Sequence, residues 1–265
     1  MEDSSATSCG RTIVLGALVF LGGFAVMVLE IVGARYLQPW FGGAFYVWTS
    51  QIGVVMLALA MGYAIGGRMA DRRKRSRELG MVLIAAGIFM LFIPTAAPKA
   101  LDAIVDRHAI ESVTVQAGIL NAEPAVELIS KLPADFIQHG SGEEKNDPAP
   151  QEAIMEVPAI WQKIDPAIGS AVVFLLPCFA LAMIAPYIIR LAAHKVANVG
   201  TLSGTVYAVS TAGSIGGVFV SAYVLIDHFS NTELFRITGL LTLSLAALCF
   251  ALDWVWPENT SNESE

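Results

Sequence analysis

Six long apolar runs constrain this chain more than any other feature. A bilayer core about 30 Å thick needs about 20 apolar residues at about 1.5 Å per residue. A window of that length finds six candidate spans: Thr12 to Tyr36, Val47 to Gly67, Leu79 to Ala97, Ile168 to Ile189, Val206 to Ile226 and Phe235 to Trp256. The runs are continuous and do not alternate with polar residues, which excludes a transmembrane β-barrel. We therefore predict an all-α polytopic membrane protein with six transmembrane helices.

The composition agrees with a membrane protein. Charged residues make up 15% of the 265 residues, against roughly a quarter in soluble domains. The three cysteines are scattered and provide no disulfide framework. The first run is longer than a signal-peptide core, so we expect it to stay as a span. The net charge of −7 is the sum of a short basic segment and a long acidic segment. No nucleic-acid partner is expected.

The positive charges between the second and third runs predict the orientation. Six cations fall within ten residues there: Arg68, Arg72, Arg73, Lys74, Arg75 and Arg77. Positive charges in short loops favour the cytoplasmic side, so we expect a cell-membrane protein with both termini cytoplasmic. The chain then divides into residues 1–97 with spans one to three, an external insertion at 98–166, residues 167–256 with spans four to six, and a cytoplasmic tail at 257–265.

The expected external insertion is acidic. Its twelve acidic residues outnumber its five basic residues, which predicts a local negative potential. Apolar residues recur at roughly helical spacing at Leu101 to Val105 and at Val126 to Leu132, which predicts two short amphipathic helices. A third is expected around Ile154 to Ile164, after a linker at Ser141 to Gln151. The histidines and carboxylates lack metal-ligand spacing, so no metal site and no cofactor are expected.

Polar side chains in the first two spans are candidate binding residues. Glu30 lies near the outer end of span one, where an ionisable group indicates a functional site. The alternatives are a structural hydrogen bond to a neighbouring helix and a position already in the membrane interface. Arg35 lies on another face and either reaches the headgroups or pairs with another helix. Thr49 and Gln51, in span two, either line a polar vestibule or bond to local groups.

The fifth span carries a stripe of hydroxyl groups. Tyr207, Ser210, Thr211 and Ser214 are spaced i, i+3, i+4 and i+7, which places them on one face of a helix. This pattern suits contact with a polar solute. The alternative is close helix packing with each hydroxyl bonded inside the protein.

Small residues and one proline predict how the spans pack. Gly62 and Gly66, and likewise Gly213 and Gly217, are four residues apart, a spacing that lets a neighbouring helix backbone come close. Pro177 predicts a bend in span four, because it lacks a backbone donor. We find no long internal repeat in the sequence.

Two groups of residues resemble a known family. The junction after span two resembles the G-x-L-A-D-R-x-G-R-R signature of the major facilitator superfamily, in Gly66, Gly67, Arg68, Met69, Ala70, Asp71, Arg72 and Arg73. More specifically, spans one, two and five resemble the membrane half of the fused MFS/spermidine synthase proteins. The residues are Glu30, Gly33, Ala34, Arg35, Pro39, Phe41, Gly42, Tyr46, Val47, Trp48, Thr49, Ser50, Gly62 and Tyr63, together with Gly204, Tyr207, Ser210, Thr211, Gly213, Ser214 and Gly217.

The resemblance implies a six-helix bundle like one half of a major facilitator, which binds or transports a small cationic metabolite such as a polyamine. The family's synthase domain has no counterpart in this chain, so we expect no enzyme activity. The alternative is a membrane anchor or assembly subunit for a separately encoded aminopropyltransferase. Because six helices match half of a twelve-helix facilitator, a homodimer is also expected.

Overall fold

The structure, a computed structural model, describes residues 2–43, 45–72, 75–120, 161–193 and 199–256. Every regular element in these ranges is helical. Six helical segments are long and apolar enough to cross a membrane. The chain is therefore an all-α polytopic membrane protein, which confirms the predicted fold class.

Each predicted apolar run corresponds to one span of the bundle. Span one is α1 (Glu2–Phe41), span two is α2 (Phe45–Arg72), span three is α3 (Ser76–Leu120), span four is α5 (Trp161–Ala182) with α6 (Ile184–Ala192), span five is α7 (Val199–Val220) with the π-helix η3 (Ser221–Leu225) and α8 (Ile226–His228), and span six is α9 (Asn231–Val255). The helices extend beyond most of the predicted runs, because backbone hydrogen bonding continues into the flanking polar residues.

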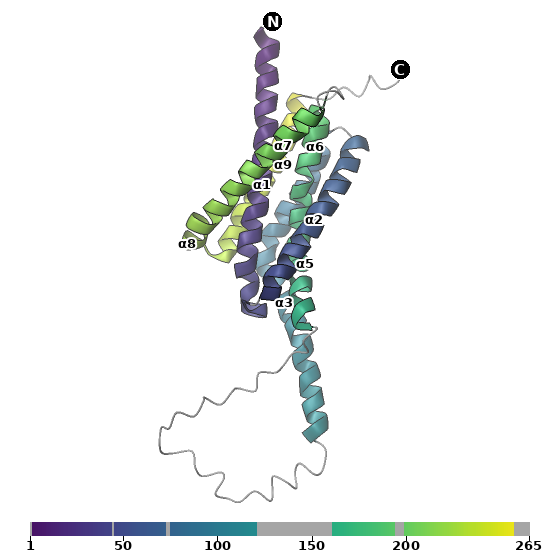
Figure 1. Cartoon of the computed structure of the whole chain (residues 1–265), viewed down its shortest axis with the longest axis vertical. Coiled ribbons are helices and arrows are strands. Elements are labelled where there is room, and N and C mark those ends of the chain that lie inside the picture. The colour runs from purple at the N-terminus through teal and green to yellow at the C-terminus, as the bar shows by residue number, and fades with distance from the viewer. Residues whose placement is uncertain (1, 44, 73–74, 121–160, 194–198, 257–265) are drawn as a thin grey trace, which may run out of the picture.

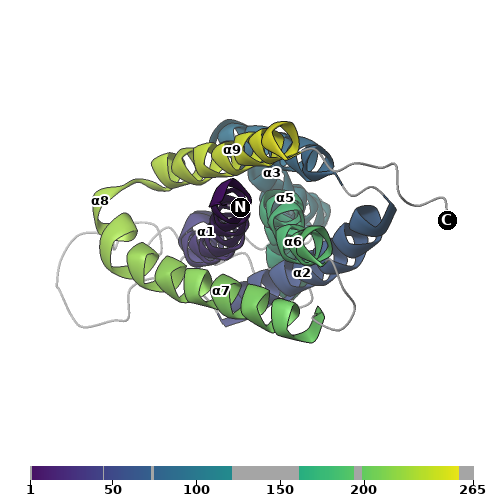
Figure 2. The same cartoon turned by 90° about the horizontal axis from the view of Figure 1, so that it is seen from above.

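Spans one and four form the centre of the bundle. α3 and α9 pack together on one side of them, and α2 and α7 flank the other side (Figure 2). The apolar windows of spans one and four are 50% and 67% buried, against 22% for span two and 17% for span five. The face formed by α2 and α7 is therefore the most open side of the bundle.

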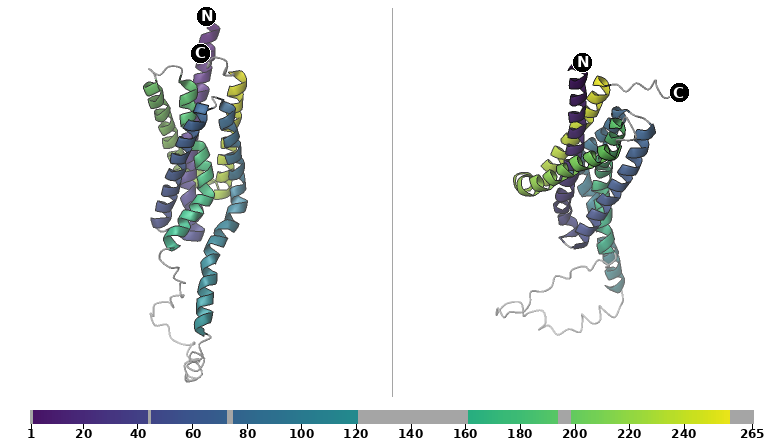
Figure 3. Two further views of the ribbon diagram at one scale, coloured as in Figure 1. Left: turned by 90° about the vertical axis from the view of Figure 1, so that its right-hand side faces the viewer. Right: turned by 45° about the horizontal axis from the view of Figure 1, so that its top comes forward.

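The two ends of the bundle differ in charge. The N-terminal end of α1 and the C-terminal end of α9 lie at one end, together with the junction of α2 and α3 (Figure 1). We call this the basic end, because it carries Arg11, Arg68, Arg72, Arg75, Arg77 and Arg190. α3 extends beyond the opposite end (Figure 3). That the basic end faces the cytoplasm stays a prediction from the charge pattern.

The packing pattern has an internal symmetry. Span one packs on span five, and span two packs in the same way on span four. Likewise, span one contacts span six, and span four contacts span three. Exchanging the first three spans with the last three therefore preserves these main contacts. Since three spans reverse the direction of the chain, the two units run in opposite directions across the bundle, as inverted repeats do.

Span four is interrupted at Met183, and the bend expected at Pro177 stays a prediction. α5 continues through Pro177, and Met183 N–H donates to the Ala180 carbonyl at 3.2 Å in a tighter turn. Pro186 follows three residues later and has no N–H to donate to the carbonyl four residues before it. The missing bond at Pro186 explains the position of the break.

The described ends of the insertion are joined by an ion pair. Arg107, on the extension of α3, contacts the Asp165 carboxylate at 2.6 Å and lies 4.8 Å from the centroid of the Trp161 ring. The short helix predicted at Leu101 to Val105 is part of α3, so the predicted boundary between residues 97 and 98 falls inside a continuous helix. The predictions at Val126 to Leu132 and at 141–151, and the tail at 257–265, lie outside the described residues; so does most of the third predicted helix.

Glycines bring α7 onto α1. A Cβ on Gly213 would overlap the backbone carbonyl of Phe20, and a Cβ on Gly217 would lie 2.6 Å from the Phe24 carbonyl oxygen. Neither position accepts a side chain without separating the helices. The two helices therefore depend on this pair of glycines for their close contact.

A second pair of glycines brings α2 onto span four. A Cβ on Gly62 would lie 2.5 Å from the Phe179 carbonyl oxygen, and a Cβ on Gly66 would lie 2.9 Å from the Met183 Cα. This contact is the counterpart of the α1–α7 contact under the internal symmetry.

We expect Gly213→Ala to destabilise the protein by about 1–3 kcal/mol, because the added methyl group forces α7 away from α1. Gly204→Ala, on the same helix, is the matched control: a Cβ there meets no atom within 4 Å, and alanine favours helix by up to about 1 kcal/mol. Thermal unfolding of the purified protein in detergent measures both. Equal midpoints for the two variants would contradict the close contact at Gly213.

We expect Asp165→Asn to destabilise the protein by about 1–3 kcal/mol, because it removes the buried ionised group that pairs with the Arg107 guanidinium. The control is Asp71→Asn, which breaks the 2.8 Å pair with Arg190. The Asp165 side chain is 7% exposed and that of Asp71 is 68% exposed, so the control should cost less than about 1 kcal/mol. Chemical unfolding compares the two, and a larger loss for Asp71→Asn would contradict this ranking.

Candidate functional site

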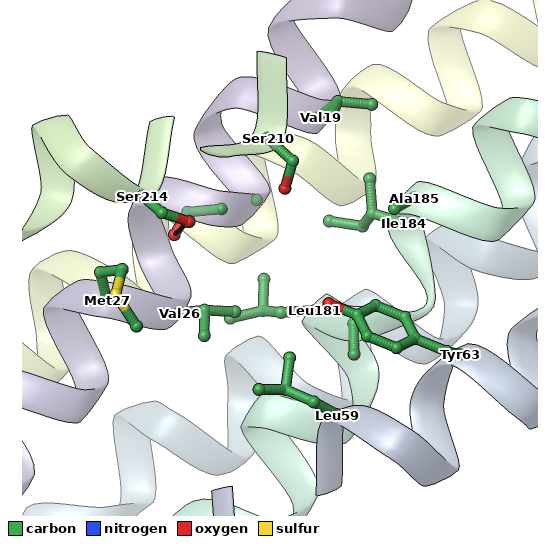
Figure 4. A pocket seen from close by; sticks show the side chains of 13 residues that line it. Val19, Val26, Met27, Leu59, Tyr63, Leu181, Ile184, Ala185, Ser210 and Ser214 are labelled. Atoms are coloured by element: carbon green, nitrogen blue, oxygen red, sulfur yellow. Dashed lines mark hydrogen bonds between the residues drawn. The ribbon is translucent and has the colours of Figure 1, made fainter. Parts of the chain in front are cut away.

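A cavity of about 120 Å³ lies between the centre of the bundle and the flanking helices α2 and α7 (Figure 4). Its walls come from α1, α2, span four and α7. The lining residues are Val19, Gly22, Gly23, Val26, Met27, Leu59, Tyr63, Leu181, Ala182, Ile184, Ala185, Ser210 and Ser214. Tyr63 is 44% exposed, so the cavity is open on the side of α2 and α7.

Three hydroxyl groups face this otherwise apolar cavity. They belong to Tyr63 on α2 and to Ser210 and Ser214 on α7, and all three point inward in Figure 4. The Ser214 hydroxyl also donates to the Gly23 carbonyl at 3.3 Å. Because Gly23 has no side chain, α7 comes close enough for its serines to reach α1.

Glu30 lies on the cavity-facing stripe of α1, one turn beyond the described lining. It follows Gly23 by seven residues and Val26 by four, so all three share a helix face. The Glu30 side chain is half-buried. No residue in the described parts of the chain forms a hydrogen bond or an ion pair with its carboxylate.

Gln51 is joined to Glu30 through the backbone. Its side chain is 1% exposed, and its Nε2 donates to the Glu30 carbonyl oxygen at 2.6 Å. Gly33 leaves the space that the amide occupies. The Gln51 Oε1 atom is buried and accepts no hydrogen bond from the described residues. A buried acceptor of this kind is unusual, since burial without a partner costs about 1–3 kcal/mol.

Of the eight predicted site residues, Ser210 and Ser214 line the cavity, and Arg35 and Thr49 bond to backbone carbonyls elsewhere. Arg35 is exposed, and its Nη1 donates to the Ile226 carbonyl at 2.9 Å, which is the predicted alternative of pairing with another helix. Thr49 is exposed and donates to the Phe45 carbonyl of its own helix at 3.0 Å. Thr49 therefore forms the local bond that was the alternative to a vestibule.

The predicted hydroxyl stripe of α7 is divided in the structure. Ser210 and Ser214 line the cavity, whereas Thr211 is exposed and donates to the Tyr207 carbonyl at 2.8 Å. Tyr207 is 51% exposed and is not among the residues that line the cavity. The four residues span a wide arc of the helix, and only part of that arc meets α1.

Among the hydroxyl groups that line the cavity, that of Tyr63 is the one that the site prediction missed. The sequence did offer a signal for Tyr63, because it directly follows Gly62, the glycine at which α2 contacts span four.

Three of the predicted structural residues, Gly67, Asp71 and Arg72, lie toward the basic end. Asp71 pairs with Arg190 on α6 at 2.8 Å, which joins span two to span four. Arg72 is exposed at the end of α2. A Cβ on Gly67 would lie 3.9 Å from the Pro186 Cβ, an ordinary contact. Among the described residues, no cluster of histidine, cysteine and acidic side chains is suited to a metal ion.

Comparison of the chain with protein-family models, with curated proteins and with solved structures found no match. The site is therefore assigned from its own geometry.

We expect the cavity to admit a small aqueous thiol reagent. In a chain whose three cysteines are replaced, Ser214→Cys should react with 2-aminoethyl methanethiosulfonate, because Ser214 lines the open cavity. Thr242→Cys is the control, since Thr242 is 0% exposed between α9 and α3. Mass spectrometry of the labelled protein measures both rates. Equal labelling of the two, or no labelling of Ser214→Cys, would contradict an open cavity.

Proposed function

We propose that this integral membrane protein binds a small organic cation of the polyamine class at the cavity between α1, α2, span four and α7, as part of a transport pathway. The observation that carries the proposal is the pair formed by Glu30 and Gln51. The Glu30 carboxylate has no hydrogen-bond or ion-pair partner among the described residues, and the Gln51 amide, which donates to the Glu30 backbone carbonyl, has a buried oxygen that also has none there.

The chemistry of this pair favours a cation with N–H groups. A carboxylate and an amide oxygen both accept hydrogen bonds, and an ammonium group offers three donors and a positive charge. A neutral solute would leave the Glu30 charge uncompensated at membrane depth, which is costly. The hydroxyls of Tyr63, Ser210 and Ser214 add acceptors in the cavity, whose lining ends one turn before Glu30 on α1.

The internal symmetry of the bundle supports transport as the purpose of this binding. Inverted units of three spans occur within each half of major facilitator transporters, with substrate sites near the interface of the repeats. The cavity of this chain lies between its two units, with walls from spans one and two and from spans four and five.

A second copy of the chain would close the open side of the cavity. The faces of α2 and α7 are the least buried surfaces of the bundle. We infer a homodimer that meets on these faces, in the cell membrane, with the basic end cytoplasmic.

The test is spermidine binding by the full chain in detergent, measured by isothermal titration calorimetry. Glu30→Gln should weaken binding about tenfold or more, because it removes the charge that pairs with the ammonium group. Asp227→Asn, an exposed carboxylate on α8, is the matched control and should leave the affinity within about twofold.

Two outcomes would contradict the proposal. One is unchanged spermidine affinity in folded Glu30→Gln. The other is no spermidine binding by the wild-type chain together with co-purification of an aminopropyltransferase, which would favour the anchor function.

A further inference from the structure

A second, larger cavity lies near the basic end of the bundle. It has a volume of about 270 Å³ and lies among α1, α6 and α7. Its walls are mostly aliphatic: Leu15, Val19, Ile188, Ala192, Leu202, Val206 and Val209. Arg11, Thr12 and Thr205 supply the polar part of the lining. We call this cavity the seam groove.

The seam groove has space because of one glycine. A Cβ on Gly16 would meet no atom within 4 Å, although Gly16 lines the groove on the central helix α1. The cavity is thus an apolar slot rather than a packed helix contact. Apolar walls of this kind favour a hydrocarbon chain over a polar solute, because water in the slot would find few polar partners.

The polar lining favours an anion. The Arg11 guanidinium donates to the Leu191 carbonyl at 3.2 Å, and a guanidinium carries five N–H donors, which suit phosphate oxygens. Among the side chains described at this end, the six arginines outnumber the acidic Asp71, Glu78 and Asp253, and α1 begins there with the acidic Glu2 and Asp3. Asp253 lies with Arg11 around a smaller neighbouring cavity. The excess of positive charge at this end attracts anionic headgroups.

We propose that the seam groove binds an anionic phospholipid. One acyl chain lies against the aliphatic walls beside Gly16, and the headgroup phosphate accepts hydrogen bonds from Arg11 and Thr12 at the mouth. A phospholipid satisfies both parts of the lining at once, whereas a free phosphate would leave the slot empty and a neutral lipid would not use the guanidinium.

The groove and the central cavity share a wall. Val19 lines both, and Ile188 in the groove lies one turn from Ile184 in the cavity. On α7, Val209 lines the groove and the next residue, Ser210, lines the cavity. A bound acyl chain therefore contacts the same stretch of α1, α6 and α7 that shapes the cavity, and it should stabilise this seam.

The experiment is native mass spectrometry of the full chain in detergent, with dioleoyl phosphatidylglycerol compared with dioleoyl phosphatidylcholine. We expect the anionic lipid to bind about tenfold more tightly, and Arg11→Gln to remove about the same factor. Arg77→Gln removes one charge from the same end without touching the groove, and it should change the affinity by less than about twofold. Inorganic phosphate should not displace the lipid.

A second arm fills the groove without changing charge. Gly16→Phe should reduce binding of the anionic lipid about tenfold by occupying the slot. Gly53→Phe, at another glycine where a Cβ meets nothing within 4 Å, should leave binding unchanged. Equal binding of the two lipids, displacement by phosphate, an equal effect of Arg77→Gln and Arg11→Gln, or full binding by folded Gly16→Phe would each overturn the proposal.

Discussion

The structure depends on close contact between helix backbones at glycine. In lipid, apolar side chains gain nothing by meeting each other instead of acyl chains, so helices associate through packing and backbone proximity. Gly213 and Gly217 bring α7 onto α1, and Gly62 and Gly66 bring α2 onto span four. These two contacts hold the flanking helices against the central pair, and the space left between the flanks is the central cavity.

This packing places the neutral and the charged polar groups of the bundle at different positions along α1. The middle of the cavity carries neutral hydroxyls from α2 and α7. The Glu30 carboxylate lies on the same stripe of α1 toward one end, and Arg11 lies on α1 at the basic end. Helix α1 therefore carries opposite charges toward its two ends. The cavity and the seam groove lie one after the other along this helix.

The two proposed ligands complement these charges separately. The unpartnered oxygens of Glu30 and Gln51 suit N–H donors, and the positive charge of Arg11, whose guanidinium also donates to the Leu191 carbonyl, suits an anion. Each site stands on different atoms, so either assignment can fail without the other. The two sites share Val19 as a lining residue. A lipid bound in the groove would therefore contact a residue that also shapes the cavity.

The sequence by itself determined the number and approximate limits of the spans, because the apolar length needed to cross a bilayer is a local property of each segment. It also placed Glu30 at membrane depth. Only the tertiary structure decided that Gln51 meets the backbone of Glu30, that the hydroxyl stripe divides between the cavity and the exposed face, and that the spans pair symmetrically. Those outcomes depend on how each helix is rotated and on which neighbour it meets, and the contacts that set them join residues far apart in the chain.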